Sequence, residues 1–340
     1  MKIAAFVKLN VGVDYHRLDL PFNHYSLDSG DSVLRIYSGQ ELKKGILRNV
    51  DIVIFSRECP FNFDTILECR KEMGFKIVVD IDDYWYLYPE HYLTNDWLRR
   101  NTSEKIMRSM READMVFCTH EKLQQRIKSF NENVHILPNA LPYGNGQFYF
   151  FTKPEKPAVI YTAGISHLHD LRSIEPALKL CGSDPQVSLN STFILAGYNT
   201  KTPRIWDIMV NIVANYGSYK KSIMRPLPHY MDHYNWASIA IAPLLDNDFN
   251  RYKSNLKILE AGCKQLPIVA SAMHPYTLDD GVKGVHLCKT ARDWYNEIKK
   301  LVLSPQLVEE EGVALYEHVK KTYDLREINK KRNELFKQLL

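Results

Sequence analysis

The 340-residue sequence lacks long hydrophobic runs. No stretch approaches the roughly 18 apolar residues that a membrane-spanning helix needs, which excludes an ordinary membrane span. The first residues, MKIAAFVKLNVGVD, contain only a short apolar run and no cleavage-like site, so we expect no signal peptide. Membrane contact, if any, is then expected to be peripheral.

Cysteine pairs with metal-binding spacing are also missing. The six cysteines are scattered without a CxxC motif, and most lie within or beside apolar segments, where a reduced thiol behaves as a small hydrophobe. We therefore expect a reduced, cytoplasmic protein without a zinc framework. The cysteines are Cys59, Cys69, Cys118, Cys181, Cys263 and Cys288.

Several enzyme signatures are absent as well. The sequence contains no P-loop, no GxGxxG motif and no Ser-His-Asp order, so kinase, dehydrogenase and serine hydrolase functions lack support. The net charge of +4 is small for this length and does not by itself indicate nucleic-acid binding.

Short apolar runs alternate with amphipathic stretches in the first half of the chain. Helical patterns lie between the apolar runs, for example at 63–73 and 121–130. Continuous apolar strands separated by helices predict a parallel sheet that is covered on both faces. The expected strands are 2–8, 33–37, 51–55, 76–81, 115–118 and 134–137.

The same alternation restarts after a segment rich in Pro, Gly and Asn, which favours neither helix nor strand. Helical patterns at 204–216 and 255–264 separate the new strands, and the chain is helical and polar from about 291 onward. Two doubly wound α/β domains that face a cleft are therefore expected, with ligands beyond the carboxyl ends of the strands. The expected strands are 158–163, 192–196, 238–243, 267–271 and 284–287. The expected parts are an N-terminal Rossmann-like domain at 1–145, a linker at 146–157, a C-terminal Rossmann-like domain at 158–315 and a C-terminal helix at 316–340. This last helix could pack back on the N-terminal domain.

The segment APLLDNDFNRYKSNLKILEAGCKQLPIVAS, at 242–271, is the most informative for function. Ser254 can cap a helix that starts at Asn255, and the free amides at that end favour an anion such as a phosphate. One face of this helix carries charged side chains, which could neutralise a diphosphate and bind ribose hydroxyls. The alternative is an ordinary amphipathic helix with a solvated charged face. The charged face consists of Lys253, Lys257, Glu260 and Lys264, opposite Leu256, Leu259 and Cys263.

Glu260 followed by QLPIVAS resembles the donor-site helix of GT-B glycosyltransferases, in particular glycosyltransferase family 4 (group 1) and its divergent relatives. The resemblance implies an enzyme with Glu260 on the ribose of a nucleotide sugar. The family has a second acidic residue eight positions earlier, and here that position is Tyr252. The implied donor-binding residues are Gly164, Lys253, Ser254, Asn255, Lys257 and Glu260.

Two further segments resemble loops of the same family. YTAGISHLHDL, at 161–171, resembles the loop after the first strand of the second domain, where Gly164 lets backbone approach the phosphates. His167 and Asp170 match a G…H..D form of such relatives. GVDYHRLDLP, at 12–21, resembles a first-domain loop, which implies that Arg17 points into the cleft on the acceptor side.

The stretch VVDIDDYWYLYP, at 78–89, places Asp82 and Asp83 after an expected strand. Asp80 precedes Asp82 by two positions, and carboxylates two positions apart could bind a divalent metal, or they could form a wall of a cleft. A metal-binding DxD belongs to the single-domain GT-A type, whereas the resemblance implies an acidic pair near the reacting sugar. We therefore expect Asp82 and Asp83 on the acceptor side, and we expect the catalytic residues to be Asp83, Asp82 and His167, without a metal.

Other constellations have alternative interpretations. HLHD at 167–170 could offer metal ligands, although phosphate or hydroxyl contacts are favoured. His229 and His233 have the i, i+4 spacing of zinc helices, but the glutamate of HExxH is missing. The basic helix expected at 97–112 could bind anionic lipid or a phosphate backbone, while a solvated helix face is the commoner explanation.

Together these features predict a glycosyltransferase that moves a sugar from a nucleoside diphosphate sugar to a hydroxyl acceptor such as a glycan or a lipid. The resemblance implies a metal-independent reaction without a cofactor, with retention at the anomeric carbon. Asp82 or Asp83 could also serve as a general base, so inversion at the anomeric carbon is an open alternative. Three alternatives remain: a nucleotide-sugar epimerase of the same fold, a glycosyltransferase acting on modified bases in DNA, and a non-catalytic binding module.

Overall fold

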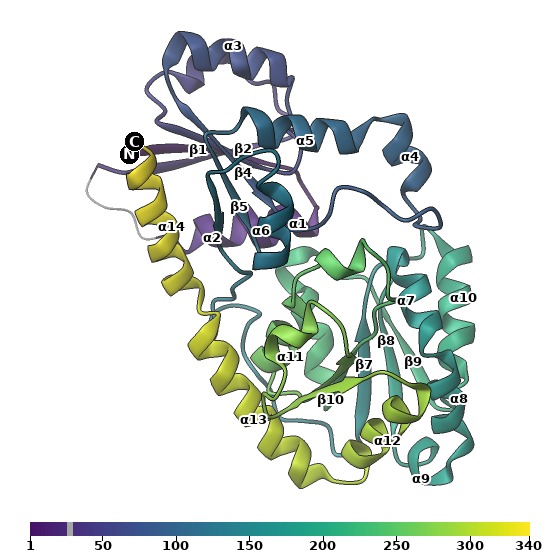
Figure 1. Ribbon diagram of the computed structural model, residues 1–340. Helices are drawn as coiled ribbons and strands as arrows, with labels where there is room; N and C mark the ends of the chain where they lie inside the picture. The colour runs from purple at the N-terminus through teal and green to yellow at the C-terminus, as the bar shows by residue number, and fades with distance from the viewer. Residues whose placement is uncertain (26–29) are drawn as a thin grey trace. The chain divides into compact units, whose positions relative to one another are not determined.

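The computed structural model describes residues 1–25 and 30–340, which form two compact units. The first unit consists of Met1–Ala140, Tyr252–Ser254 and Leu325–Leu340. The second consists of Leu141–Arg251 and Asn255–Asp324. Each unit contains one six-stranded sheet (Figure 1).

The sheet of the first unit is parallel, with the strand order β2-β1-β3-β4-β5-β6. All six expected strands are confirmed, with small differences at their ends. The central strands are buried along nearly their whole length because helices cover both faces, which explains their continuous apolar sequences. The strands are β1 (Lys2–Val7), β2 (Ser32–Tyr37), β3 (Ile52–Ser56), β4 (Lys76–Ile81), β5 (Met115–Cys118) and β6 (Val134–Ile136).

Helix α3 (Phe63–Met73) coincides with the predicted helix. The side chain of Asn62 accepts a hydrogen bond from the amide of Thr65 at its start, and Gly74 ends it in the left-handed conformation. The other α-helices of the first unit are α1 (Gly12–Asp14), α2 (Leu20–Asn23), α4 (Thr94–Arg99), α5 (Thr102–Glu112), α6 (Glu121–Ile127) and α14 (Leu325–Leu339).

The single basic helix expected at 97–112 is wrong. The segment contains the end of α4 and all of α5, and the break lies at Asn101, whose φ is 53°. A left-handed residue interrupts the helical hydrogen-bond pattern, and asparagine tolerates this conformation better than most residues. The periodicity of the apolar positions did not reveal this break.

Helix α14 packs on the sheet of the first unit, although it is the last element of the chain (Figure 1). The ring centroids of Phe336 and Phe117 lie 5.6 Å apart. The side-chain amide of Asn329 also donates to the carbonyl of Pro21 at 2.9 Å. The two ends of the chain lie close together in this unit.

The sheet of the second unit is also parallel, in the order β12-β11-β10-β7-β8-β9. The five expected strands are confirmed. Strand β9 was not predicted, because its sequence YKKSI is mostly exposed and polar, as suits a strand at an edge of the sheet. The strands are β7 (Ala158–Thr162), β8 (Thr192–Tyr198), β9 (Tyr219–Ile223), β10 (Ile239–Ala242), β11 (Ile268–Ser271) and β12 (Val285–Cys288).

Helices flank both faces of this second sheet (Figure 1). Helices α11 and α13 pack closely because Gly262 lies against Val319 and Gly312 lies against the carbonyl of Gln265. The helices are α7 (Leu168–Ser173), α8 (Glu175–Ser183), α9 (Pro185–Ser188), α10 (Pro203–Ala214), α11 (Leu256–Cys263), α12 (Ala291–Val302) and α13 (Pro305–Thr322). A 3-10 helix spans Leu227–Trp236.

The strand orders define where each sheet should bind a ligand. In the first sheet, β2 lies on one side of β1 and β3 lies on its other side. The switch point, where the strand order reverses direction, therefore lies between β1 and β3. In the second sheet the switch point lies between β7 and β10. Ligands of doubly wound sheets bind beyond the carboxyl ends of the strands at such points.

Candidate functional site

Glu260 lies at the centre of a polar network in the second unit. Its carboxylate accepts hydrogen bonds from the hydroxyl of Tyr234 at 2.7 Å and the hydroxyl of Tyr230 at 3.0 Å. The ammonium group of Lys257 lies 2.7 Å from the same carboxylate and donates to Thr162 Oγ1 at 2.9 Å. Because Thr162 ends β7, this network adjoins the switch point of the second sheet.

The Glu260 carboxylate at the centre of this network is buried, whereas Lys257 is 29% exposed along its side chain, and this corrects the alternative of a wholly solvated charged face. Glu260 is only 1% exposed and Lys264 only 2%. Helix α11 begins at Leu256 and ends at Cys263, so Lys253 precedes the helix and Lys264 follows it. Burial and the nearby Glu260 carboxylate hold the pKa of Tyr234 well above its usual range, so this hydroxyl remains a donor.

Ser254 does not cap α11, and this expectation was wrong. Its hydroxyl accepts a hydrogen bond from the side-chain amide of Asn139 at 2.7 Å. Ser254 and Lys253 both group with the first unit, whereas Asn255 and the helix belong to the second. Asn255 occupies the position before the helix and makes no side-chain cap.

The side chain of Asn255 is engaged within the second unit. Its amide donates to Asp279 Oδ2 at 2.6 Å and to the hydroxyl of Tyr323 at 2.9 Å. Asp279 is 2% exposed and also accepts from His318 at 2.9 Å. The structure therefore gives Asn255 a role in positioning the start of α11, which the sequence analysis did not predict.

The loop after β7 carries Gly164 and His167. Gly164 has an extended backbone, and a β-carbon there would meet only the Ser166 hydroxyl oxygen, at 3.8 Å. His167 Nδ1 lies 2.7 Å from Asp170 Oδ2. The other oxygen of Asp170 accepts from the amide of Leu245 and from the side chain of Asn250, both at 2.8 Å.

Arg17 does not point into an open cleft. It is 2% exposed and lies in the interior of the first unit, where Nε and Nη2 contact the two oxygens of Asp80 at 2.7 and 3.0 Å. The guanidinium also donates to Asn139 Oδ1 and to the carbonyl of Leu137. Burial lowers the pKa of Arg17, but the Asp80 carboxylate raises it more, so the guanidinium stays protonated. Burial raises the pKa of Asp80, and Arg17 opposes this shift only in part.

Asp82 and Asp83 follow β4, and one guanidinium bridges them. Arg57 Nε lies 2.7 Å from Asp82, and Arg57 Nη2 lies 2.7 Å from Asp83. Burial raises the pKa of Asp82, but the charge and hydrogen bond of Arg57 lower it by more than burial raises it. The pKa of Asp82 is therefore below its usual value. The sequence analysis missed Arg57, which directly follows β3 at the switch point of the first sheet.

A second missed cluster lies at the same switch point. Asp14 is 1% exposed and accepts hydrogen bonds from the hydroxyl of Ser56 and from the backbone amide of Lys8, both at 2.6 Å. Burial raises the pKa of Asp14 and lowers the pKa of Lys8, while each charge opposes the shift of the other. Because Lys8 follows β1 and Ser56 ends β3, the strand-end rule could have identified these residues.

The aromatic residues after Asp83 pack largely against protein. Tyr84 stacks on Tyr252 with ring centroids 4.6 Å apart. Trp85 is 2% exposed and lies edge-on to Phe130 in the core of the first unit. Tyr86 is 46% exposed, so among Tyr84, Trp85 and Tyr86 it offers the most surface to a ligand.

Of the two histidines in the 3-10 helix, His229 lies on the surface and His233 lies in the interior. His229 is exposed beside Asp232, whereas His233 is 4% exposed with Nδ1 at 2.7 Å from the hydroxyl of Ser222. Burial, aided by the charge of Arg225, lowers the pKa of His233 to about 4. His233 is therefore neutral at physiological pH and serves packing.

The arginines of α4 and α5 face carboxylates. Arg108 pairs with Asp64, and Arg111 lies 3.0 Å from Glu104. Arg100, which lies between the two helices, pairs with Glu58 at 3.2 Å. These ion pairs reduce the positive field that a phosphate backbone or an anionic membrane would require.

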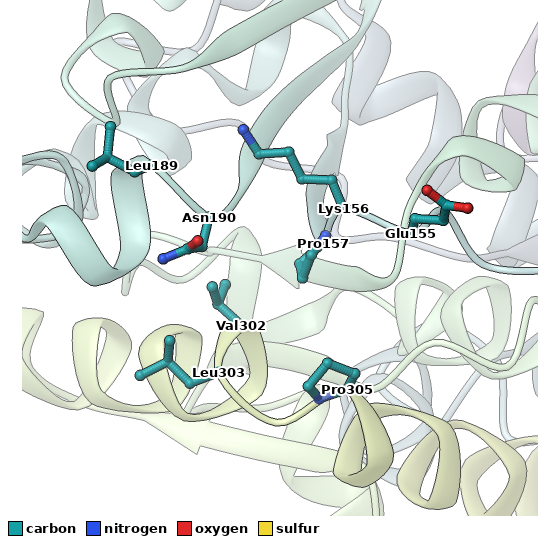
Figure 2. Close-up of a pocket in the computed structure, with 8 residues that line it drawn as sticks. All are labelled: Glu155, Lys156, Pro157, Leu189, Asn190, Val302, Leu303 and Pro305. Atoms are coloured by element: carbon teal, nitrogen blue, oxygen red, sulfur yellow. The ribbon is translucent and has the colours of Figure 1, made fainter.

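A hollow of about 530 Å³ lies at the opposite end of the second sheet (Figure 2). Pro157 immediately precedes β7, and Asn190 lies before β8. Leu303 follows α12, and Pro305 is the first residue of α13. The hollow is therefore at the amino ends of the strands, away from the edge where doubly wound sheets bind their ligands.

Two observations concern metals and membranes. Within residues 1–25 and 30–340, no three His, Cys, Asp or Glu side chains gather in an arrangement suited to holding a metal ion. Among the helices of this described part, none has both the length and the hydropathy for crossing a bilayer.

No protein-family model matches the sequence, and no curated protein matches it. Several solved structures are nevertheless similar. HepE from Anabaena, solved in complex with UDP-glucose, has a TM-score of 0.70 and 12% identity over 99% of this chain and 100% of that chain. A glycosyltransferase from Rickettsia africae has a TM-score of 0.68 and 14% identity over 99% of this chain and 98% of that chain.

TarM from S. aureus, solved in a complex that includes UDP, has a TM-score of 0.63 and 15% identity. The match covers 84% of this chain and 55% of the TarM chain, so this chain spans about half the length of TarM. At these identities the similarity establishes the fold. The chain has the two Rossmann-like sheets of the GT-B fold, as the sequence analysis predicted.

Proposed function

We propose that this protein is a glycosyltransferase that moves a sugar from a nucleoside diphosphate sugar to a hydroxyl group. The observation that carries the proposal is the match along 99% of the chain to HepE, whose structure was solved with UDP-glucose. The Glu260 network at the switch point of the second sheet supports it, because donor nucleotides need a carboxylate for ribose and cations for the diphosphate.

The second unit is proposed to bind the donor. Each oxygen of Glu260 can accept more than one hydrogen bond, so ribose hydroxyls can join or replace Tyr230 there. Lys257 is 29% exposed along its side chain and supplies positive charge beside the same carboxylate. The backbone of the Gly164 loop and His167 are proposed to contact the diphosphate. Lys253 and Ser254 group with the first unit, so a diphosphate contact for them is implied by the family resemblance alone.

The first unit is proposed to bind the acceptor, with Asp82 and Asp83 near the reacting sugar and Arg17 supporting the strand ends from the interior. A carboxylate whose pKa is lowered by a paired guanidinium is a weak general base. Because Asp82 is in this state, the arrangement favours retention at the anomeric carbon over inversion by a base-activated acceptor. Glycans, lipids and other hydroxyl compounds are all candidate acceptors.

The proposal includes a metal-independent reaction. Departure of a nucleoside diphosphate leaves negative charge on its terminal phosphate, which fixed cations and backbone amides can stabilise. Lys257 and the amides at the start of α11 have this character in the second unit. No cofactor enters this mechanism, and the donor sugar is a substrate.

The experiment that tests the donor site is the Glu260→Gln variant, with nucleotide affinity measured by calorimetry. Loss of the carboxylate should weaken binding of the nucleotide by about 10- to 100-fold, because hydrogen bonds to charged groups contribute roughly 1.5–3 kcal/mol. Glu72→Gln, on the exposed face of α3, is the matched control and should bind as the wild type does. Melting temperatures of both variants show whether the fold is intact, and unchanged affinity in a folded Glu260→Gln protein contradicts the assignment.

A further inference from the structure

Asp170 is in hydrogen-bond contact with three residues from two loops of the second unit. It is 2% exposed, and its two oxygens are used differently. Oδ2 lies 2.7 Å from Nδ1 of His167, three residues earlier. Oδ1 accepts from the amide of Leu245 and from the side-chain amide of Asn250, both at 2.8 Å.

These contacts join the two loops at the switch point of the second sheet. His167 and Asp170 follow β7, whereas Leu245 and Asn250 follow β10, and the two strands are neighbours in the sheet. Asn250 is 1% exposed, and its side-chain amide also donates to the carbonyl of Leu245. The two ends of the segment from Leu245 to Asn250 are therefore hydrogen-bonded to each other and to Asp170. One carboxylate thus fixes both loops where a ligand is expected.

The same geometry selects one form of the His167 ring. A carboxylate can only accept, so the 2.7 Å contact requires the proton of the neutral imidazole on Nδ1. Nε2 is then the ring nitrogen through which His167, 27% exposed along its side chain, can act on a substrate. In this form Nε2 accepts a hydrogen bond from a hydroxyl, and after taking up a proton it donates to a phosphate oxygen.

We propose that Asp170 is a positioning residue that sets the tautomer and orientation of His167 and locks the loop from Leu245 to Asn250 against it. The part of the proposal that concerns turnover rests on the proposed function, because it takes His167 as a contact of the donor diphosphate or sugar. The part that concerns the tautomer rests on the hydrogen bonds alone.

Asp170→Asn separates the two roles of the carboxylate. The new amide should keep its oxygen toward Leu245 and Asn250, because two donors lie on that side. Its NH₂ group then faces His167 Nδ1, which must become the acceptor, so the ring proton moves to Nε2. The matched control, Asn250→Ala, removes a loop contact and leaves the His167–Asp170 hydrogen bond in place.

The first measurement is the imidazole ¹⁵N NMR spectrum in alkaline buffer, with the His167 signals assigned by their loss in His167→Gln. The wild type and Asn250→Ala should show the proton on Nδ1, and Asp170→Asn should show it on Nε2. A wild-type ring protonated on Nε2 overturns the proposal, and this result needs neither the Asn variant to fold nor the enzyme to be active.

The second measurement compares turnover with nucleotide affinity. In Asp170→Asn, kcat for sugar transfer should fall roughly 10- to 100-fold, the range seen when the partners that orient metal-ligating histidines are removed, while the affinity for UDP stays within about 3-fold. Melting temperatures of Asp170→Asn and Asn250→Ala should fall by similar amounts, so that stability alone cannot explain the loss. An unchanged kcat together with a shifted tautomer refutes the part of the proposal that concerns turnover. If neither the wild type nor any variant transfers sugar, the result contradicts the proposed function instead.

Discussion

Arg57 combines an unusual backbone with a central side-chain position. Its φ is 56°, which is uncommon for a residue with a β-carbon and costs on the order of 1 kcal/mol. Its amide donates to the carbonyl of Asp80 at 2.9 Å, and its guanidinium holds both Asp82 and Asp83. The surrounding contacts therefore impose the left-handed conformation and direct one cation onto the acidic pair.

We predict that Arg57→Met shifts the pH dependence of activity. Burial raises the pKa of Asp82, and Arg57 overrides this effect in the wild type. Without the guanidinium the pKa of Asp82 rises, so protonation occurs at higher pH and the acidic limb of kcat/KM moves upward in pH. The measurement is a pH profile of sugar transfer.

Arg108→Met is the matched control for this prediction, because Arg108 forms an exposed pair with Asp64 on α3. Exposed pairs contribute little, and this one is not at a strand end, so its profile should overlay that of the wild type. An acidic limb that stays in place in Arg57→Met means that Asp82 is not needed as a carboxylate.

At the level of elements, α11 depends on its contact with α13. Gly262 of α11 faces Val319, and Gly312 of α13 faces the carbonyl of Gln265 just after α11. The helices approach this closely because both positions lack a β-carbon. The helix that carries Lys257 and Glu260 is therefore positioned by a helix that lies about 50 residues later in the sequence.

Gly312→Ala should destabilise the protein by about 1–3 kcal/mol, the usual effect of overpacking. A β-carbon there would lie 1.9 Å from the carbonyl oxygen of Gln265. The cost of this steric clash outweighs the gain in helix propensity from replacing glycine with alanine. Gly45→Ala, at a position with open space, is the control and should stay within about 0.5 kcal/mol. Chemical denaturation measures both, and equal stabilities would show that the α11–α13 contact relaxes without cost.

At the level of the whole molecule, two doubly wound sheets follow each other in one chain, and each carries charged residues at its own switch point. The first sheet presents Lys8, Asp14 and Arg57 there, and the second presents Thr162 with the Glu260–Lys257 pair. This division agrees with the proposed transfer between two substrates, with one set of groups for each substrate.

We predict that sugar transfer by the whole protein persists in excess EDTA. Lys257 and the α11 amides should provide the charge stabilisation that a divalent cation provides elsewhere. The measurement is the transfer rate with and without the chelator, at saturating donor. A rate that collapses in EDTA and recovers with added Mg²⁺ or Mn²⁺ would show that the reaction needs a metal.

Local sequence patterns determined most of the helices and strands and the fold type of this protein. Strands such as 76–81 and the helix at 63–73 follow from apolar periodicity and from capping residues close in sequence, so they could be predicted. The exposed strand β9 and the break at Asn101 could not, because neither leaves an apolar pattern.

The partners of the polar residues were decided only by the tertiary structure. Arg17 was expected to face a cleft, yet it pairs with Asp80, which lies 63 positions later in the sequence. Asp170 likewise contacts Asn250 across 80 positions. Charged side chains have no periodicity that reveals their partners, and strand order decides which loop ends meet at an edge of a sheet. The sequence by itself therefore identified the type of sheet and the positions of its loops, while packing decided which carboxylate each cation meets.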